Sequence, residues 1–263
     1  MCAQSGSNAY FNVPDAYDKF MGRYSRPLAH EFIRTVPLKA GDRVLDLGCG
    51  PGALTAPLVD LLGADAVTGV DPSPPFIDAY LQRFPGVTGK VGSAEDIPFE
   101  DHAFDAVMSQ LVIHFIQDVD SAGREMVRVT KPGGWIAACT WVIDQMEFIH
   151  LFTEVAIDVT GEEPPSPPAR RFGEEDAIAG YFSSLGLEEI SNTTLEVSST
   201  YDRFDDLWGT YLLGIGPFAQ WTQGQPDAVK ADLQRVMLER LGNPVGSITL
   251  NAVARSAVGQ VPL

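Results

Sequence analysis

The stretch that decides the fold is Val44-Leu-Asp-Leu-Gly-Cys-Gly-Pro-Gly-Ala-Leu-Thr55, where a short apolar run meets a cluster of glycines and then a helical pattern. Gly48, Gly50 and Gly52 stand at alternate positions in it. Because glycine has no side chain, the backbone can turn tightly here and approach a ligand closely, while the N–H groups that begin the next helix offer hydrogen bonds. We therefore expect these glycines to form the floor of a nucleotide pocket.

The chain on both sides of this turn alternates between strand and helix patterns. Short apolar runs predict strands at 42–47, 66–70, 86–91, 104–109, 135–142, 187–199 and 247–254. Helical periodicity predicts helices at 17–36 (one or two, interrupted by Pro27), 53–62, 74–84, 118–130, 145–159, 174–185, 204–213 and 227–241. Strands that alternate with helices are typical of βαβ units on a parallel sheet with right-handed crossovers. The sequence therefore predicts a doubly wound α/β fold.

Asp71 is the second feature that points to a nucleotide ligand at the glycine turn. It closes the second predicted strand, 19 residues after Gly52. At this spacing a carboxylate can accept hydrogen bonds from both hydroxyls of a ribose. An aspartate before a proline also occurs as a simple turn former, and a glycine turn also occurs without any ligand, so the two features carry weight mainly as a pair.

Several segments resemble, in order, the motifs of the class I S-adenosylmethionine-dependent methyltransferases. They are 44–55, 67–73 (VTGVDPS), 92–101 (GSAEDIPFED), 104–118 (FDAVMSQLVIHFIQD) and 127–135 (VRVTKPGGW). The resemblance covers about 17–142 and is greatest to small-molecule enzymes of the ubiquinone and menaquinone biosynthesis type. It implies a Rossmann-like, doubly wound sheet of seven strands, mostly parallel with an antiparallel last strand, together with helical cap and lid insertions.

The resemblance also implies which residues meet the cofactor, S-adenosyl-L-methionine, and its product S-adenosyl-L-homocysteine. The turn from Gly48 through Cys49 and Gly50 to Gly52 would face the methionine and ribose parts, with Asp46 orienting it. The other expected cofactor residues are Asp71 for the ribose, Pro72 for the adenine face, Gln110 and Leu111 beside the sulfonium, and Tyr17 and Arg23 for the carboxylate.

The loop that meets the adenine differs from the family pattern. The family often has Asp or Asn where this chain has Ser93. The contact to the adenine amino group would then come from Ser93, from Glu95 or from a backbone group near Ala94, since a hydroxyl also accepts hydrogen bonds.

Methyl transfer from a sulfonium needs few catalytic groups, because the leaving group is neutral and the main task is alignment and exclusion of water. A hydroxyl or ammonium acceptor would benefit from a general base, and His114, just beyond the strand at 104–109, is the candidate. The alternative for His114 is a packed structural residue. Histidines and cysteines show no metal-ligand spacing, so we expect no metal.

The amino-acid composition limits the kinds of partner that we expect for this protein. The net charge is −17, with 35 acidic and 18 basic residues and no Lys/Arg cluster, which argues against a nucleic-acid substrate. No apolar run is long enough for a membrane span, and 1–12 lacks the features of a secretory signal, so we expect a cytoplasmic monomer or homodimer. Aromatic residues late in the chain would either line an acceptor pocket or form core. The acceptor expected is a small, partly hydrophobic metabolite.

We divide the chain into an N-terminal helical cap at 1–36, a cofactor-binding core at 37–142, and lid helices and remaining strands at 143–263 that complete the same domain. Two alternatives remain at this point. A nicotinamide-dependent oxidoreductase would share the turn and the acidic ribose residue but predicts GxGxxG, whereas this chain reads Gly48-Cys-Gly-Pro-Gly52. A noncatalytic cofactor-binding regulatory module would differ only in lacking methyl transfer.

Overall fold

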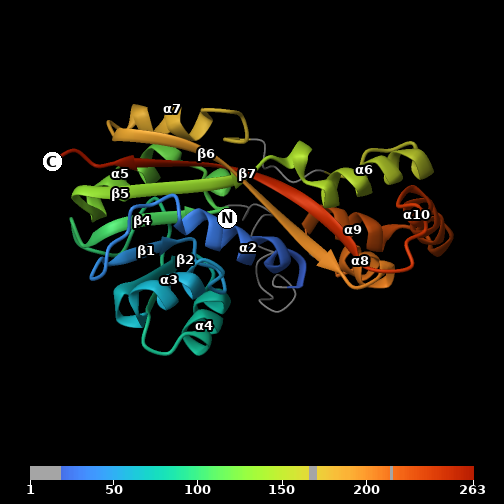
Figure 1. The fold of residues 1–263 in the computed structure, drawn as a ribbon, viewed down its shortest axis with the longest axis horizontal. Coiled ribbons are helices and arrows are strands. Elements are labelled where there is room, and N and C mark those ends of the chain that lie inside the picture. The colour runs from blue at the N-terminus through green and yellow to red at the C-terminus, as the bar shows by residue number, and fades with distance from the viewer. Residues whose placement is uncertain (1–18, 166–170, 214–215) are drawn as a thin grey trace, which may run out of the picture.

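The computed structural model describes residues 19–165, 171–213 and 216–263, except for the side chains of residues 216 and 217. Its centre is one seven-stranded sheet with the order β3-β2-β1-β4-β5-β7-β6 (Figure 1). All pairings from β3 to β5 are parallel, and β7 is antiparallel to both of its neighbours. The strands are β1 (Val44–Leu47), β2 (Val67–Asp71), β3 (Thr88–Val91), β4 (Phe104–Gln110), β5 (Thr130–Trp141), β6 (Glu188–Tyr201) and β7 (Ile248–Gln260).

Helices cover both faces of this sheet. The helices longer than one turn are α2 (Gly22–Ile33), α3 (Thr55–Leu62), α4 (Pro74–Arg83), α5 (Val119–Val129), α6 (Glu147–Thr160), α7 (Ala177–Ser184), α8 (Phe204–Tyr211), α9 (Gly216–Gly224) and α10 (Asp227–Arg240). One apolar cluster joins α2 and α3 to one face of the sheet, and a second joins α5 and α7 to the other. The predicted Rossmann-like, doubly wound fold with an antiparallel last strand is confirmed.

The central strands are apolar because both of their faces are covered. Every residue of β1 and of β2 is buried, including Asp46 and Asp71. Parallel strands flanked by helices on both sides read as continuous apolar runs rather than alternating ones. A carboxylate within such a run must find hydrogen-bond partners there, which makes these two aspartates the residues to follow.

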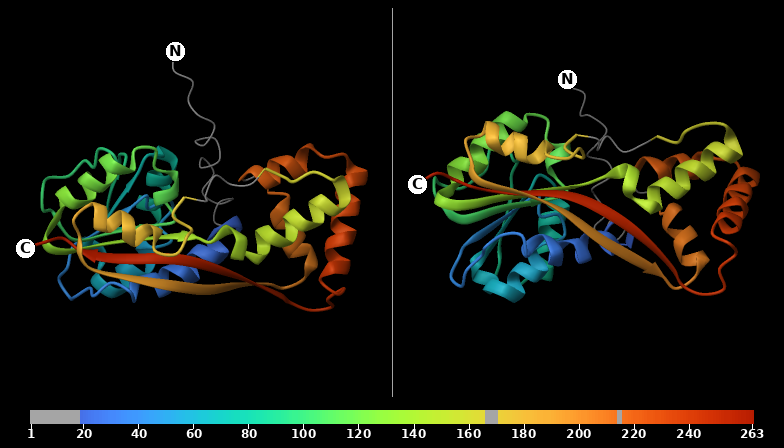
Figure 2. Two further views of the ribbon diagram at one scale, coloured as in Figure 1. Left: turned by 90° about the horizontal axis from the view of Figure 1, so that it is seen from above. Right: turned by 45° about the horizontal axis from the view of Figure 1, so that its top comes forward.

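Beyond the central strands, β6 and β7 continue as a long two-stranded ribbon that leaves the sheet and meets α6, α8, α9 and α10 (Figure 2). We call these four helices and the far half of the ribbon the helical lobe. Its interior is aromatic: Phe148 and Tyr211 stack with ring centroids 4.2 Å apart, and Phe152 lies 4.7 Å from Tyr211. The late aromatics among the described residues thus mostly form core.

Three elements differ from the sequence-based expectation. Pro27 lies inside a single helix, α2, where it removes one intrahelical hydrogen bond without ending the helix. The last strand, β7, runs on to Gln260, because its small residues are buried between β5 and β6 and need no β-branched side chains to pair. Helix α9 was not predicted at all, since its composition (GPFAQWTQG) lacks a regular apolar stripe.

The strand β5 also begins earlier than expected, at Thr130. The segment from Lys131 to Gly134, between the helix expected at 118–130 and the strand expected at 135–142, falls where the β4–β5 register shifts between the pairs Phe104–Thr130 and Ala106–Trp135. Gly133 there has φ +74°, a left-handed conformation that glycine adopts at low cost. In the described part of the chain, no helix combines the length and the apolar character required to cross a bilayer.

Candidate functional site

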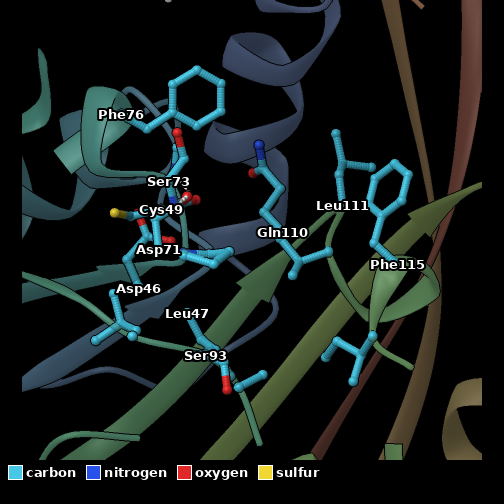
Figure 3. Close-up of a pocket in the computed structure, with 18 of the residues that line it drawn as sticks. Asp46, Leu47, Cys49, Asp71, Ser73, Phe76, Ser93, Gln110, Leu111 and Phe115 are labelled. Carbon is cyan, nitrogen blue, oxygen red and sulfur yellow. Dashed lines mark hydrogen bonds between the residues drawn. The ribbon is translucent and has the colours of Figure 1, made fainter. Parts of the chain in front are cut away.

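A cavity of about 480 Å³ opens at the carboxyl ends of β1, β2 and β4 (Figure 3). In open parallel sheets this edge is where ligands gather, and the volume is in the range of small-molecule sites. Its walls come from the end of each strand and the turn after it. Expected cofactor residues that line it are Asp46, Gly48, Cys49, Gly50, Asp71, Pro72, Ser93, Ala94, Glu95, Gln110 and Leu111.

The glycine turn forms the floor of this cavity. The N–H groups of Gly48 and Cys49 both donate to the carbonyl of Val70, at 2.7 and 3.0 Å, which ties the turn to β2. Gly48 has φ +75°, and a Cβ atom there would lie 2.3 Å from a methyl carbon of Val112. Gly50 has φ +50° but meets only Phe76, at 3.9 Å. Of these two glycines, Gly48 is therefore the one that is required by both conformation and space.

Asp71 lies across the turn and fixes its backbone. Its two carboxylate oxygens accept hydrogen bonds from the N–H of Gly50, at 2.9 Å, and from that of Ser73, at 2.8 Å. Burial raises the pKa of Asp71, while these two hydrogen bonds act against the increase. Each carboxylate oxygen has a further lone pair, so the group can still accept from two hydroxyls in the cavity.

Asp46 is 1% exposed and accepts a hydrogen bond from the Thr55 hydroxyl at 2.7 Å. Burial raises its pKa to about 7, and the neighbouring charge of Asp71 adds to the increase. The hydrogen bond runs from β1 to the first residue of α3, so Asp46 holds together the strand and the helix that flank the glycine turn.

The end of β4 links the cavity to α2. The side-chain amide of Gln110 donates to the carbonyl of Ser25 at 2.9 Å, while its own oxygen is buried without a partner among the described residues. Leu111 has φ +62°, a strained conformation for a residue with a branched side chain, and its N–H donates to Cys139. An orphaned acceptor and a strained backbone at a cavity wall fit a ligand that carries hydrogen-bond donors.

Two expected cofactor residues, Gly52 and Arg23, lie away from the cavity. Gly52 does not line the cavity, because its Cα faces Phe84, whose ring carbon lies 2.2 Å from where a Cβ atom would stand. Arg23 points to the opposite side of α2, where its guanidinium pairs with Asp206 at 2.7 Å and lies 4.8 Å from the centroid of the Tyr201 ring. This difference arises because α2 packs against β6. Tyr17 lies outside the described residues.

His114 is 9% exposed and is not among the residues that line the cavity. Its Nδ1 atom is 2.8 Å from the Thr140 hydroxyl, and burial lowers its pKa to about 4. At neutral pH the ring is uncharged and hydrogen-bonded inside the core. This geometry matches the structural reading of His114 rather than the general base.

Sequence reasoning missed several lining residues. They are Leu47, Pro51, Ala53, Leu54, Val70, Ser73, Pro74, Phe76, Gly92, Val112, Phe115, Ile116, Gln117 and Ser25. Ser25 belongs to α2, and no local pattern marks it, because only the packing of α2 over the end of β4 brings it to the cavity. Phe115 could have been found from the sequence, since it lies in the short segment between β4 and α5, just beyond the carboxyl end of the strand. In the described chain, no group of three His, Cys, Asp or Glu residues could hold a metal ion.

Comparison with known proteins identifies a family whose model matches the segment that forms most of this cavity. Residues 45–138 match the family model described as "Methyltransferase domain". The chain carries a methyltransferase domain. The match begins in β1 and ends in β5, so it spans the glycine turn, Asp71 and the end of β4. The resemblance to the class I, S-adenosylmethionine-dependent methyltransferases is thereby confirmed, and the nicotinamide alternative is set aside.

Individual relatives of this methyltransferase domain agree with the family. An uncharacterized methyltransferase of Schizosaccharomyces pombe is 29% identical over 174 residues, which cover 59% of this chain and 63% of that protein. The chain spans less than two thirds of the length of the curated relatives it matches first.

Solved structures show the same fold. A structure from Anaeromyxobacter dehalogenans, described as a type II methyltransferase, superposes with a TM-score of 0.66 at 22% identity, over 90% of this chain and 97% of that chain. Phosphoethanolamine N-methyltransferase 2 of Haemonchus contortus superposes with a TM-score of 0.55 at 18% identity, over 95% of this chain and 57% of that chain. That structure contains S-adenosylhomocysteine and phosphomonomethylethanolamine.

Proposed function

We propose that this protein transfers a methyl group from S-adenosyl-L-methionine to a small, partly hydrophobic acceptor. The observation that carries the proposal is the shared cavity of the glycine turn and Asp71, in which a buried carboxylate is hydrogen-bonded to the turn and keeps lone pairs for a ribose. The residues that would hold the cofactor are those expected from the sequence that line the cavity, with Gly52 and Arg23 left out.

The charge of the cavity suits this cofactor. The titratable side chains among its described lining residues are Cys49 and the carboxyl groups of Asp46, Asp71 and Glu95. Burial raises the pKa of the Cys49 thiol, so it stays neutral. When bound, the cofactor supplies a methyl carbon that is already activated by the positive charge of its sulfonium. Carboxylates favour a cation, and this attraction weakens when the methyl group leaves with the charge, which assists product release.

The tasks left to the chain are alignment and exclusion of water. Gln110, held by the Ser25 carbonyl, has at the end of β4 a buried side-chain oxygen that lacks a hydrogen-bond partner among the described residues. Leu111 and Val112 follow it at the cavity wall. We infer that the acceptor enters beside these residues. We also infer that His114, which does not line the cavity, does not take a proton from the acceptor. The proton then goes to solvent, or the acceptor reacts in its deprotonated form.

An apolar rim supports the hydrophobic character of the acceptor. Leu111, Val112, Phe115 and Ile116 line the cavity on this side, and Phe115 is 41% exposed. Apolar walls with few polar groups select ligands by shape and by burial of apolar surface. The acidic net charge of −17 further favours a small-molecule acceptor over nucleic acid. The cytoplasmic location and the state of monomer or homodimer stay predictions.

Calorimetric titration with S-adenosylmethionine, S-adenosylhomocysteine and NAD tests the cofactor. We expect both adenosyl ligands to bind and NAD not to bind; tight binding of NAD alone would overturn the proposal. Release of S-adenosylhomocysteine should then be followed with matched acceptors that share one apolar skeleton and carry a hydroxyl, an amine or a carboxylate. Cofactor binding without turnover of any acceptor would favour the noncatalytic module.

A further inference from the structure

A group of charged side chains lies behind the loop 92–101, outside the cavity. The first part of this loop lines the cavity through Ser93, Ala94 and Glu95. The second part, from Ile97 to Asp101, turns away toward α5. Little strand pairing supports the loop: the described contacts there include one isolated bridge, between Ser93 and Asp96. Side-chain contacts must therefore help to fix its position, and one of them comes from Lys90 of β3, which donates to the carbonyl of Pro98 at 3.0 Å.

Arg128, near the end of α5, makes more of the described side-chain hydrogen bonds to this loop than any other residue. Its guanidinium donates to the carbonyl of Ile97 at 3.0 Å, to the carbonyl of Phe99 at 2.8 Å and to the carboxylate of Asp101 at 2.8 Å. The planar group has five N–H donors in a fixed arrangement, which suits several acceptors at once. Arg128 thus holds three successive points of the loop from one side.

Glu125 completes the arrangement. Its carboxylate accepts from the N–H of Ile97 at 2.8 Å and pairs with Arg128 at 2.7 Å. The hydrogen bond from Arg128 lowers the pKa of Glu125, so the pair stays charged at neutral pH. Ile97 is buried, and both of its backbone polar groups are satisfied by this ion pair. The pair takes the place of a neighbouring strand, since buried backbone groups need partners.

We propose that Glu125 and Arg128 are positioning residues for the adenine of the cofactor. They hold Ile97 in place, and Ile97 in turn holds Ser93, Ala94 and Glu95, which lie four, three and two residues before it, at the cavity wall. The proposal rests on the proposed function, in which this loop meets the adenine edge. It assigns discrimination of the base to two side chains that never touch the ligand.

The test compares Arg128→Met with Arg124→Met. Arg124 lies one turn earlier on α5, is exposed, and donates to Ser121 on its own helix. The ligands are S-adenosylhomocysteine and S-inosylhomocysteine, which carries an oxygen in place of the adenine amino group. For Arg128→Met we expect the dissociation constant for the adenosyl ligand to rise about tenfold, because hydrogen bonds to a charged group are lost. The constant for the inosyl ligand should change little.

The preference for adenine should therefore fall in Arg128→Met and persist in Arg124→Met, while kcat at saturating cofactor changes little and KM for the cofactor rises. Glu125→Gln, which keeps an oxygen for the Ile97 N–H, should give a smaller loss of the same preference and serves if Arg128→Met folds poorly. An equal rise for both ligands with lower thermal stability would mean a structural role only and overturn the proposal. Unchanged binding of both ligands to Arg128→Met would overturn the positioning role and leave the proposed function in place. Wild-type protein that binds neither ligand would overturn the proposed function as well.

Discussion

The cavity and the helical lobe are built on opposite principles. At the cavity, position depends on the backbone: left-handed residues, N–H groups bound to Asp71, and carbonyls bound by side chains. In the lobe, position depends on side-chain packing, with Phe148, Phe152 and Tyr211 stacked in a closed aromatic core. The backbone positions at the cavity are determined by short local sequence motifs. The packing of the helical lobe forms only when segments that are distant in the sequence come together. The two regions should therefore respond differently to substitution.

The largest effect should come from the lobe. Phe152 is fully buried and packs against Tyr211, Phe218 and Trp221. Removing its ring in Phe152→Ala leaves a cavity that should cost about 3–5 kcal/mol of unfolding free energy. We expect this loss in chemical denaturation, with the affinity for S-adenosylhomocysteine measured at low temperature unchanged within about twofold. A large loss of affinity in a folded variant would mean that the two regions are coupled.

Asp71→Ala should give the converse result. Its carboxylate organises the turn through Gly50 and Ser73 and, in the proposed function, accepts from the ribose. We expect the dissociation constant for S-adenosylhomocysteine to rise about a hundredfold, since charge-assisted hydrogen bonds contribute about 1.5–3 kcal/mol each. Titration calorimetry measures this change. Relief from burying a carboxylate should leave the thermal stability of the ligand-free variant near that of the wild type, and full binding in this variant would contradict the site.

A pH series sharpens the contrast further. Burial raises the pKa of Asp46 to about 7, well above its value of about 3.9 in an unfolded chain. The folded state therefore binds this proton more tightly, so the stabilising contribution is complete below about pH 4 and is lost as pH rises through about 7. We expect the unfolding free energy of the ligand-free protein to fall between about pH 4 and 7, and to fall less in Asp46→Asn. Parallel curves for the two proteins would contradict this assignment.

The smallest effect concerns Arg23 and Asp206, which join α2 to the lobe. Both side chains are about one-third exposed, at 31% and 33%. An ion pair of this kind contributes about 0.2–1 kcal/mol. Arg23→Gln should therefore lower the unfolding free energy by no more than this and leave cofactor affinity unchanged. A clear loss of affinity would restore Arg23 to the cofactor site and show that α2 rearranges on binding.

The same contrast explains what the sequence could predict. The strands β1, β2 and β4 and the turn after β1 were found because apolar runs, glycines and Asp71 follow one another within a short segment. The placement of Gly48, Asp71 and Gln110 at one cavity was likewise found, since the carboxyl ends of parallel strands meet at one edge. Arg23 was misplaced because the side of α2 that faces the cavity depends on how α2 packs against β6.

The full length of β7 and the helix α9 could not be predicted for a related reason. The second half of β7, with Ser256, Ala257 and Gly259, has low strand propensity and pairs only because β5 and β6 lie on both sides. Gly52 shows the limit at the site itself: glycine spacing predicts a tight turn, but only the packing of Phe84 reveals that the third glycine serves the interior.

The ribbon of β6 and β7 has a mechanical consequence. Its pairing runs without a break from Glu188 opposite Gln260, in the sheet, to Tyr201 opposite Ile248, in the lobe, apart from one shift of register near Glu188. Opening either end would strip hydrogen bonds along the same two strands. Heat or denaturant should therefore melt the sheet and the lobe in one concerted step, and two separate transitions in a calorimeter would show that the ribbon acts as a hinge.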